Sequence, residues 1–255
     1  MKYLFFIGLM CVCFGFVIKP IEKPGKQIFL LMGQSNMAGR GVLTDAFKSL
    51  QNSRVLMLNP NSEWVVAKHP MHFDKPKAVG VGPGLAFGIA LADASPKDTI
   101  YLVPCAVGGT SIAKWEPNAF DKATNTHPYD DALLRIKEAM KKGKITGAIW
   151  LQGESDSNPK GATVYLSKLT RLIERVRTAT HNPKLPFVVG ELGTFRENYK
   201  LINIELNKLP SLVPFTGVVT SENLTHKGDT THFDGASATV YGERFAKGML
   251  TLMKK

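Results

Sequence analysis

The chain has 255 residues, 44% of them hydrophobic, and a formal net charge of +11. This length and apolar content suffice for one large domain with a sizeable buried core. The positive charge favours acidic partners such as anionic polysaccharide or the cell envelope. Because the lysines are scattered and no nucleic-acid-binding motif is present, we expect no nucleic acid partner.

The first twenty residues differ in character from the rest of the chain. Lys2 is followed by an apolar stretch that runs from Leu4 to Ile18 and ends at Lys19 and Pro20. This pattern predicts a signal peptide at residues 1–20, ahead of one domain at residues 21–255. We therefore expect a secreted or periplasmic protein with no stable membrane span after cleavage, while a lipid-linked anchor and the oligomeric state stay open.

Strand-like and helix-like segments alternate along the remainder. Apolar runs of strand length lie at residues 27–32, 54–58, 99–104, 145–151, 186–190 and 216–220. Helix-like stretches lie between several of them, at residues 130–142, 162–179 and 236–253. Alternation of this kind predicts a parallel sheet that is covered by helices on both faces.

A serine and a histidine at opposite ends of the domain are candidates for one catalytic site. Ser35 directly follows the first strand-like run, and ligands bind parallel α/β sheets outside the carboxyl ends of the strands. Serine needs a base to become nucleophilic, and histidine has the most suitable pKa. His232 is our candidate base, and Asp229, three residues earlier, is the carboxylate that would orient it.

Each of these signals also has a purely structural interpretation. A serine after a strand is often a helix cap, and Asp-x-x-His is a common surface-turn composition. The other histidines are expected in solvated loops, including His69 and His72 in a stretch rich in proline and lysine, and His226. Their spacing does not match common zinc sites, so we expect no metal. Only the conjunction of serine, aspartate and histidine points to a hydrolase.

Four sequence blocks resemble the SGNH-type esterases of carbohydrate esterase family six and the sialate O-acetylesterase-like group. They occur in that family's order and are GQSNMAGR (33–40), GGTS (108–111), WLQGESD (150–156) and DTTH (229–232). The resemblance implies a flavodoxin-like three-layer α/β/α sandwich with a central parallel sheet of about five strands. It also implies a serine carboxylic-ester hydrolase without a cofactor.

The resemblance assigns roles to individual residues. Ser35 would be the nucleophile, His232 the general base and Asp229 its orienting partner. The oxyanion hole would consist of the backbone N–H groups of Ser35 and Gly109 with the side-chain amide of Gln152. Four further residues would be auxiliary or would contact the sugar, namely Gln34, Glu154, Arg40 and Trp115. Preorganised N–H donors stabilise the charge that develops on the ester carbonyl oxygen, whatever the family.

We therefore expect a secreted O-acetyl esterase that acts on an acetylated carbohydrate such as acetylxylan. A sialate O-acetylesterase is the alternative within the same chemistry. An alternative of another class is a non-catalytic carbohydrate-binding protein on an esterase fold, although all three catalytic positions are filled here. The sequence does not reveal which sugar or which hydroxyl position carries the acetyl group.

Overall fold

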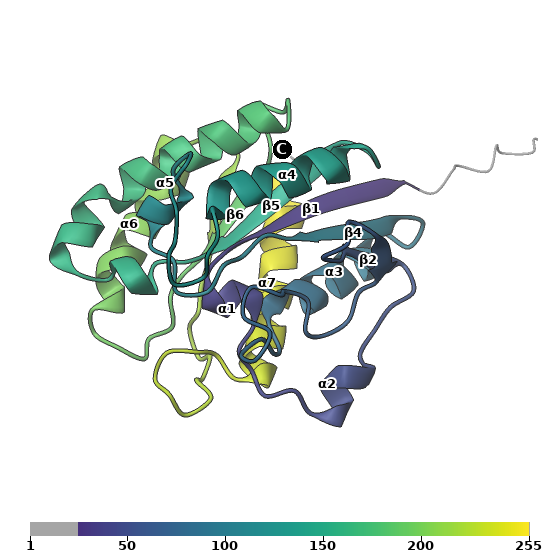
Figure 1. The fold of residues 1–255 in the computed structure, drawn as a ribbon, viewed down its shortest axis with the longest axis horizontal. Coiled ribbons are helices and arrows are strands. Elements are labelled where there is room, and N and C mark those ends of the chain that lie inside the picture. Colours follow the sequence, from purple (N-terminus) through teal and green to yellow (C-terminus); the bar gives the residue numbers. More distant parts are fainter. Residues whose placement is uncertain (1–24, 255) are drawn as a thin grey trace, which may run out of the picture.

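The computed structural model describes residues 25–254, and a seven-stranded sheet lies at its centre (Figure 1). The strand order is β3-β2-β4-β1-β5-β6-β7, and every neighbouring pair is parallel except β2 and β3. The strands are β1 (Lys26–Gly33), β2 (Val55–Leu58), β3 (Trp64–Val66), β4 (Thr99–Pro104), β5 (Ile145–Leu151), β6 (Phe187–Gly190) and β7 (Thr216–Val219). The predicted signal peptide lies outside the described residues.

Helices cover both faces of the sheet, as predicted. They are α1 (Ser35–Ala38), α2 (Asp45–Ser49), α3 (Pro83–Ala94), α4 (Pro128–Met140), α5 (Pro159–Ala179), α6 (Tyr199–Leu212) and α7 (Gly235–Met253), with short 3₁₀ turns η1 (Ile112–Trp115) and η2 (Glu154–Asp156). One apolar cluster joins the sheet to α4, α5 and α6, and a second joins it to α3 and α7. The α/β/α sandwich is thus confirmed, with more strands than the five expected.

The differences from the predicted elements have local causes. The extra strand β3 has only three residues and is partly exposed, which is too short to show an alternating pattern. Helix α3 is buried around most of its circumference and lacks the polar stripe by which surface helices are recognised. Helices α4 and α5 each begin two to three residues before the predicted start, because proline is favourable at the first helical position.

The central strands β4, β1 and β5 all end at the same edge of the sheet. From Ile28 onward β1 is fully buried, as expected for a strand covered on both faces. Gly33 ends β1 with a φ of +132°, and a β-carbon there would overlap the carbonyl oxygen of Leu151 at the end of β5. Only glycine lets the two strand ends lie this close while the chain turns toward Ser35.

Two loop histidines are buried rather than solvated, contrary to the prediction. His69 and His72 are 5% and 4% exposed and lie in the loop that connects β3 to α3. Burial lowers the pKa of each imidazole to about 4, so both rings are neutral at pH 7. This loop turns inward because its apolar residues join the core, with Met71 almost fully buried.

Candidate active site

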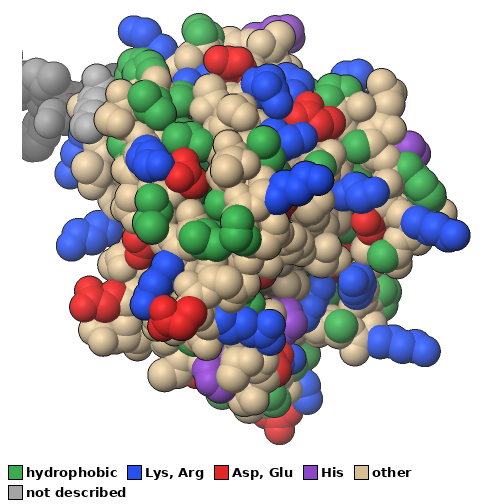
Figure 2. Space-filling model, turned by 90° about the vertical axis from the view of Figure 1, so that its left-hand side faces the viewer, with side chains coloured by type: hydrophobic (Ala, Val, Ile, Leu, Met, Phe, Trp, Pro, Cys, Tyr) green, Lys and Arg blue, Asp and Glu red, His purple; other side chains and the backbone are tan. Residues whose placement is uncertain are grey.

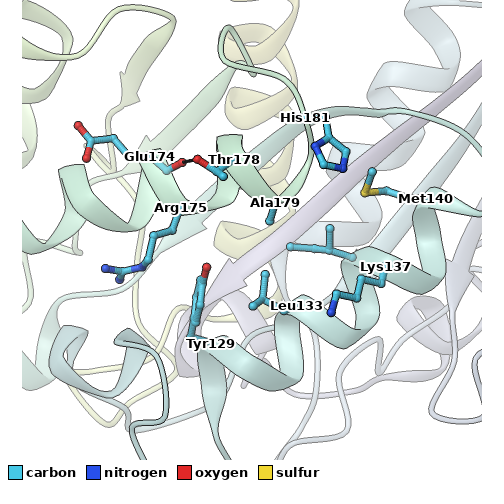
Figure 3. Close-up of a pocket in the computed structure, with 10 residues that line it drawn as sticks. Tyr129, Leu133, Lys137, Met140, Glu174, Arg175, Thr178, Ala179 and His181 are labelled. Atoms are coloured by element: carbon cyan, nitrogen blue, oxygen red, sulfur yellow. Dashed lines mark hydrogen bonds between the residues drawn. The ribbon is translucent and has the colours of Figure 1, made fainter.

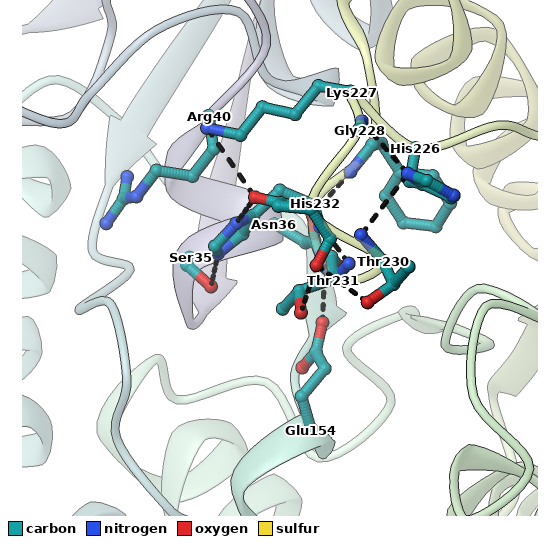
Figure 4. Close-up of polar contacts among 12 residues, drawn as sticks. Ser35, Asn36, Arg40, Glu154, His226, Lys227, Gly228, Thr230, Thr231 and His232 are labelled. Atoms are coloured by element: carbon teal, nitrogen blue, oxygen red, sulfur yellow. Dashed lines mark hydrogen bonds and ion pairs between the residues drawn. The ribbon is translucent and has the colours of Figure 1, made fainter.

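Ser35, His232 and Asp229 form a continuous hydrogen-bonded relay at the carboxyl ends of the strands. Figure 4 shows Ser35 and His232 side by side, with Asn36 between the same segments. Ser35 Oγ lies 3.0 Å from His232 Nε2, and His232 Nδ1 lies 2.7 Å from Asp229 Oδ2. With the Nδ1 proton donated to the carboxylate, Nε2 is free to accept the hydroxyl proton of Ser35. The structure thus places these three side chains in the order that nucleophile activation requires.

The spacing of Asp229 and His232 follows from a tight turn. Asp229 Oδ1 accepts hydrogen bonds from the backbone N–H groups of Thr231 and His232, at 3.0 and 2.8 Å. The second carboxylate oxygen, Oδ2, is then directed at the imidazole. One aspartate therefore both shapes the turn and orients the ring, which explains the three-residue separation.

The electrostatic environment keeps His232 neutral and Asp229 ionised. Burial lowers the pKa of the His232 imidazole below its usual value, against the opposing effect of the Asp229 carboxylate. Partial burial raises the pKa of Asp229, but hydrogen bonds from His232 and Thr231 outweigh it and hold that pKa well below its usual range. At pH 7 the pair therefore consists of a neutral base and a charged partner.

Two backbone N–H groups beside Ser35 are available for a ligand. Within residues 25–254, neither the N–H of Ser35 nor that of Gly109 has a hydrogen-bond acceptor. Gly109 is exposed and has a φ of +84°, and its carbonyl oxygen accepts a hydrogen bond from Ser155 Oγ at 3.1 Å. The positive φ favours glycine and leaves the space above its α-carbon open.

Gln152 lies beside this pair but does not present a free N–H. Its side chain is fully buried, and Nε2 donates to Asp156 Oδ2 at 2.6 Å, to the Thr110 carbonyl at 3.0 Å and to Gln34 Oε1 at 3.1 Å. Gln34 is itself 2% exposed. Gln152 thus joins the loops that carry Gln34, Thr110 and Asp156, and its part in an oxyanion hole stays a prediction.

Glu154 acts on the relay through Asn36. The Asn36 amide donates to Glu154 Oε1 and, at 3.0 Å, to the carbonyl oxygen of Thr231, while its Oδ1 accepts from the N–H of Phe233 at 3.1 Å. Asn36 therefore holds both sides of His232. The sequence signal for Asn36 is its position next to Ser35, and its contacts with Glu154 and Thr231 were not predicted.

We expect Glu154→Gln to retain activity and Glu154→Ala to reduce it. Burial raises the pKa of the Glu154 carboxyl, and its Oε2 atom has no partner within the described residues, so a neutral acceptor suffices for Asn36. Glutamine keeps this acceptor, whereas alanine leaves the Asn36 amide unpaired, which we expect to lower kcat about tenfold. Equal losses in the two variants, measured on p-nitrophenyl acetate, would instead mean that the charge is required.

Arg40 and Trp115, the other two candidates for auxiliary or sugar contacts, both pack within the protein. Arg40 forms a buried ion pair with Asp74 at 2.9 Å, and the same carboxylate oxygen accepts the N–H of Gly108 at 2.7 Å. This network holds the loop that leads to Gly109. Trp115 is fully buried, donates to Thr110 Oγ1 at 3.2 Å and packs edge-on against Trp150. Both side chains are buried, at 8% and 0% exposure, which favours the structural alternative for each of them.

An apolar groove of about 560 Å³ lies elsewhere, between α4 and α5 (Figure 3). Its walls include Tyr129 and Leu133 from α4 and Arg175 from α5, and it contains none of the relay residues. Among residues 25–254 no group of three metal-ligating side chains is present, and no helix is long and apolar enough to span a membrane.

The chain is similar to known carbohydrate esterases over nearly its whole length. A family model described as "Carbohydrate esterase, sialic acid-specific acetylesterase" matches residues 25–251. A probable carbohydrate esterase of Arabidopsis thaliana is 33% identical over 250 residues, which cover 89% of this chain and 92% of that protein.

Solved structures give the same fold. An Arabidopsis thaliana protein superimposes with a TM-score of 0.79 at 30% identity and covers 89% of this chain and 99% of its own. NanS superimposes with a TM-score of 0.73 at 17% identity, over 92% of this chain and 99% of NanS.

Proposed function

Since the chain belongs to the carbohydrate esterase family of sialic acid-specific acetylesterases, we propose that it removes acetyl groups from carbohydrate through an acyl-enzyme at Ser35. The observation that carries this proposal is the relay from Ser35 Oγ through His232 to Asp229. A neutral imidazole at 3.0 Å from a serine hydroxyl, with free N–H groups beside it, is the arrangement that acyl transfer needs.

The reaction would proceed in two halves. Ser35 Oγ attacks the acetyl carbonyl carbon while its proton moves to His232 Nε2, and the N–H groups of Ser35 and Gly109 bind the resulting oxyanion. Collapse breaks the bond to the sugar oxygen, which takes the proton from His232. Water then attacks acetyl-Ser35 with His232 again as base, and acetate leaves.

Labelling with a phosphonate ester tests the nucleophile directly. The reagent phosphonylates an activated serine, and we expect a single adduct on the peptide that contains Ser35. Release of acetate from an acetylated polysaccharide, measured in the same preparation, would link that serine to the substrate. A protein that binds the sugar without an adduct and without acetate release would instead be a carbohydrate-binding protein.

The substrate we propose first is an acetylxylan-like polysaccharide, because Gly109 of the proposed oxyanion hole is exposed at the protein surface. Lys and Arg side chains are distributed over the face of the molecule toward which β1 runs (Figure 2). We further propose that residues 1–20 direct secretion, which sequencing of the mature N-terminus would test.

A sialate or another carboxylated sugar is the second candidate, and Lys75 is the observation that favours it. A β-carbon on Gly109 would lie 3.5 Å from Lys75 Nζ, and no other heavy atom would be within 4 Å. Lys75 Nζ has no hydrogen bond or ion pair with any other residue in the described part of the chain. Its neighbour Asp74 is held by Arg40 and Gly108, so the backbone that carries Lys75 is anchored near Gly109.

Lys75→Gln is expected to change the choice of substrate. The variant removes a positive charge beside the ester, so the ratio of kcat/KM on O-acetylated sialic acid to that on acetylxylan should fall about tenfold. Lys137→Gln, at an exposed position of α4, is the matched control for net charge. An unchanged ratio in Lys75→Gln would show that this lysine does not recognise a carboxylate.

A further inference from the structure

His226 lies behind the turn that carries Asp229 and His232 and accepts hydrogen bonds from it (Figure 4). Its Nδ1 atom is 2.9 Å from the N–H of Gly228 and 3.2 Å from the N–H of Thr230. These two amides are on either side of Asp229. To accept both, Nδ1 must carry a lone pair, so the ring is the neutral tautomer with its proton on Nε2.

The turn needs such support because its backbone is in an uncommon conformation. Thr230 has a φ of +52°, which is rare for a β-branched residue, and Gly228 has a φ of +111°. Residues in this region persist only where their surroundings hold them. Arg196 holds the outer side of the turn by donating to the Thr230 carbonyl at 3.1 Å and to Thr231 Oγ1 at 2.8 Å. His226 accepts hydrogen bonds from the N–H groups of Gly228 and Thr230.

His226 is itself fixed by its backbone and by its ring. It forms an antiparallel bridge with Phe233, the residue that follows His232. Its ring packs edge-on against Phe195, with centroids 5.1 Å apart, and Phe195 packs against Phe233 at 5.2 Å. The acceptor atom therefore has a constant position relative to both ends of the turn.

We infer that His226 is a positioning residue for the Asp229–His232 pair. This inference rests on the proposed function, because the pair matters only if His232 is the base. His226 does not contact Ser35 or the reacting atoms. Its Nδ1 holds the two amides that flank Asp229, and so it directs the carboxylate at the imidazole of His232.

Two substitutions separate the acceptor from the bulk of the ring. His226→Asn keeps an acceptor oxygen bonded to Cγ, where Nδ1 is bonded in histidine, whereas His226→Leu keeps apolar bulk against Phe195 without an acceptor. We expect His226→Leu to lower kcat on p-nitrophenyl acetate about tenfold with KM within a factor of two, and His226→Asn to keep most of the wild-type kcat. His181→Leu, at an exposed position, is the control.

Amide hydrogen exchange makes the test independent of catalysis. In Ser35→Ala protein, the N–H of Thr230 should be protected with histidine or asparagine at position 226 and exchange at least tenfold faster with leucine. Wild-type kcat in His226→Leu would overturn the inference, as would equal losses in the leucine and asparagine variants. If wild type and Ser35→Ala hydrolyse the ester equally, the proposed function fails, while the exchange result still decides whether His226 holds the turn.

Discussion

Ser35→Ala is expected to lower kcat on p-nitrophenyl acetate by about 10⁴-fold or more, because the variant removes the hydroxyl oxygen that lies 3.0 Å from His232 Nε2. Ser35 is 6% exposed, and alanine has the same shape without the oxygen, so the free energy of unfolding should change little. The measurement is the steady-state rate beside a urea unfolding curve. Ser211→Ala, on the exposed side of α6, is the matched control.

The double variant with Ser35→Ala and His232→Ala tests whether the two residues act together. If serine and histidine act as one unit, His232→Ala alone should lose about as much activity as Ser35→Ala, and the double variant should lose little more. Two losses that multiply would mean that the residues contribute independently. That result would contradict the acyl-enzyme mechanism, in which the two residues act together.

Acidification from pH 7 to pH 5 is expected to reduce the free energy of unfolding by about 4 kcal/mol through His69 and His72. Burial lowers the pKa of each ring from its ordinary value of 6.5 to about 4 in the folded protein. Between these values the unfolded chain binds more protons, so stability falls as the pH falls through this window. Each unit below pH 6.5 costs about 1.4 kcal/mol per histidine.

Urea unfolding at both pH values checks this expectation. His69→Gln has no titrating ring, so its loss of stability between pH 7 and pH 5 should be about 2 kcal/mol smaller than that of wild type. His181→Gln removes an exposed histidine and serves as the comparison. The same loss of stability in wild type and His69→Gln would show that the pKa of His69 does not differ between the folded and the unfolded protein.

Much of the architecture was predictable because it depends on local patterns. The strands β1, β4 and β5 are long apolar runs, and each is followed by a glycine-containing or polar block, so their ends could be identified from the sequence. The Asp229–His232 pair was equally accessible, since the aspartate and the histidine belong to one turn. Their catalytic roles remain predictions until the variants are measured.

The supporting contacts were not predictable, because they join residues far apart in the chain. Glu154 and Asn36 are 118 positions apart, and Asp74 reaches Gly108 and Arg40 across a separation of 34. Trp115 looked available because it follows the GGTS block, yet the 3₁₀ turn η1 directs it into the core. Packing decides whether a side chain contacts sugar or the protein's own core. This packing involves residues far apart in the chain, so the sequence around a residue does not reveal it.

The separation of 197 residues between Ser35 and His232 also sets when activity can begin. A ribosome makes the nucleophile after β1 and its base only after β7, and α7, which begins at Gly235, then packs in the same apolar cluster as α3. Until His232 is in place beside it, Ser35 has no base and is inert. Ester hydrolysis therefore requires both ends of the domain to be in place, so the onset of turnover during refolding would time the docking of the His232 turn against Ser35.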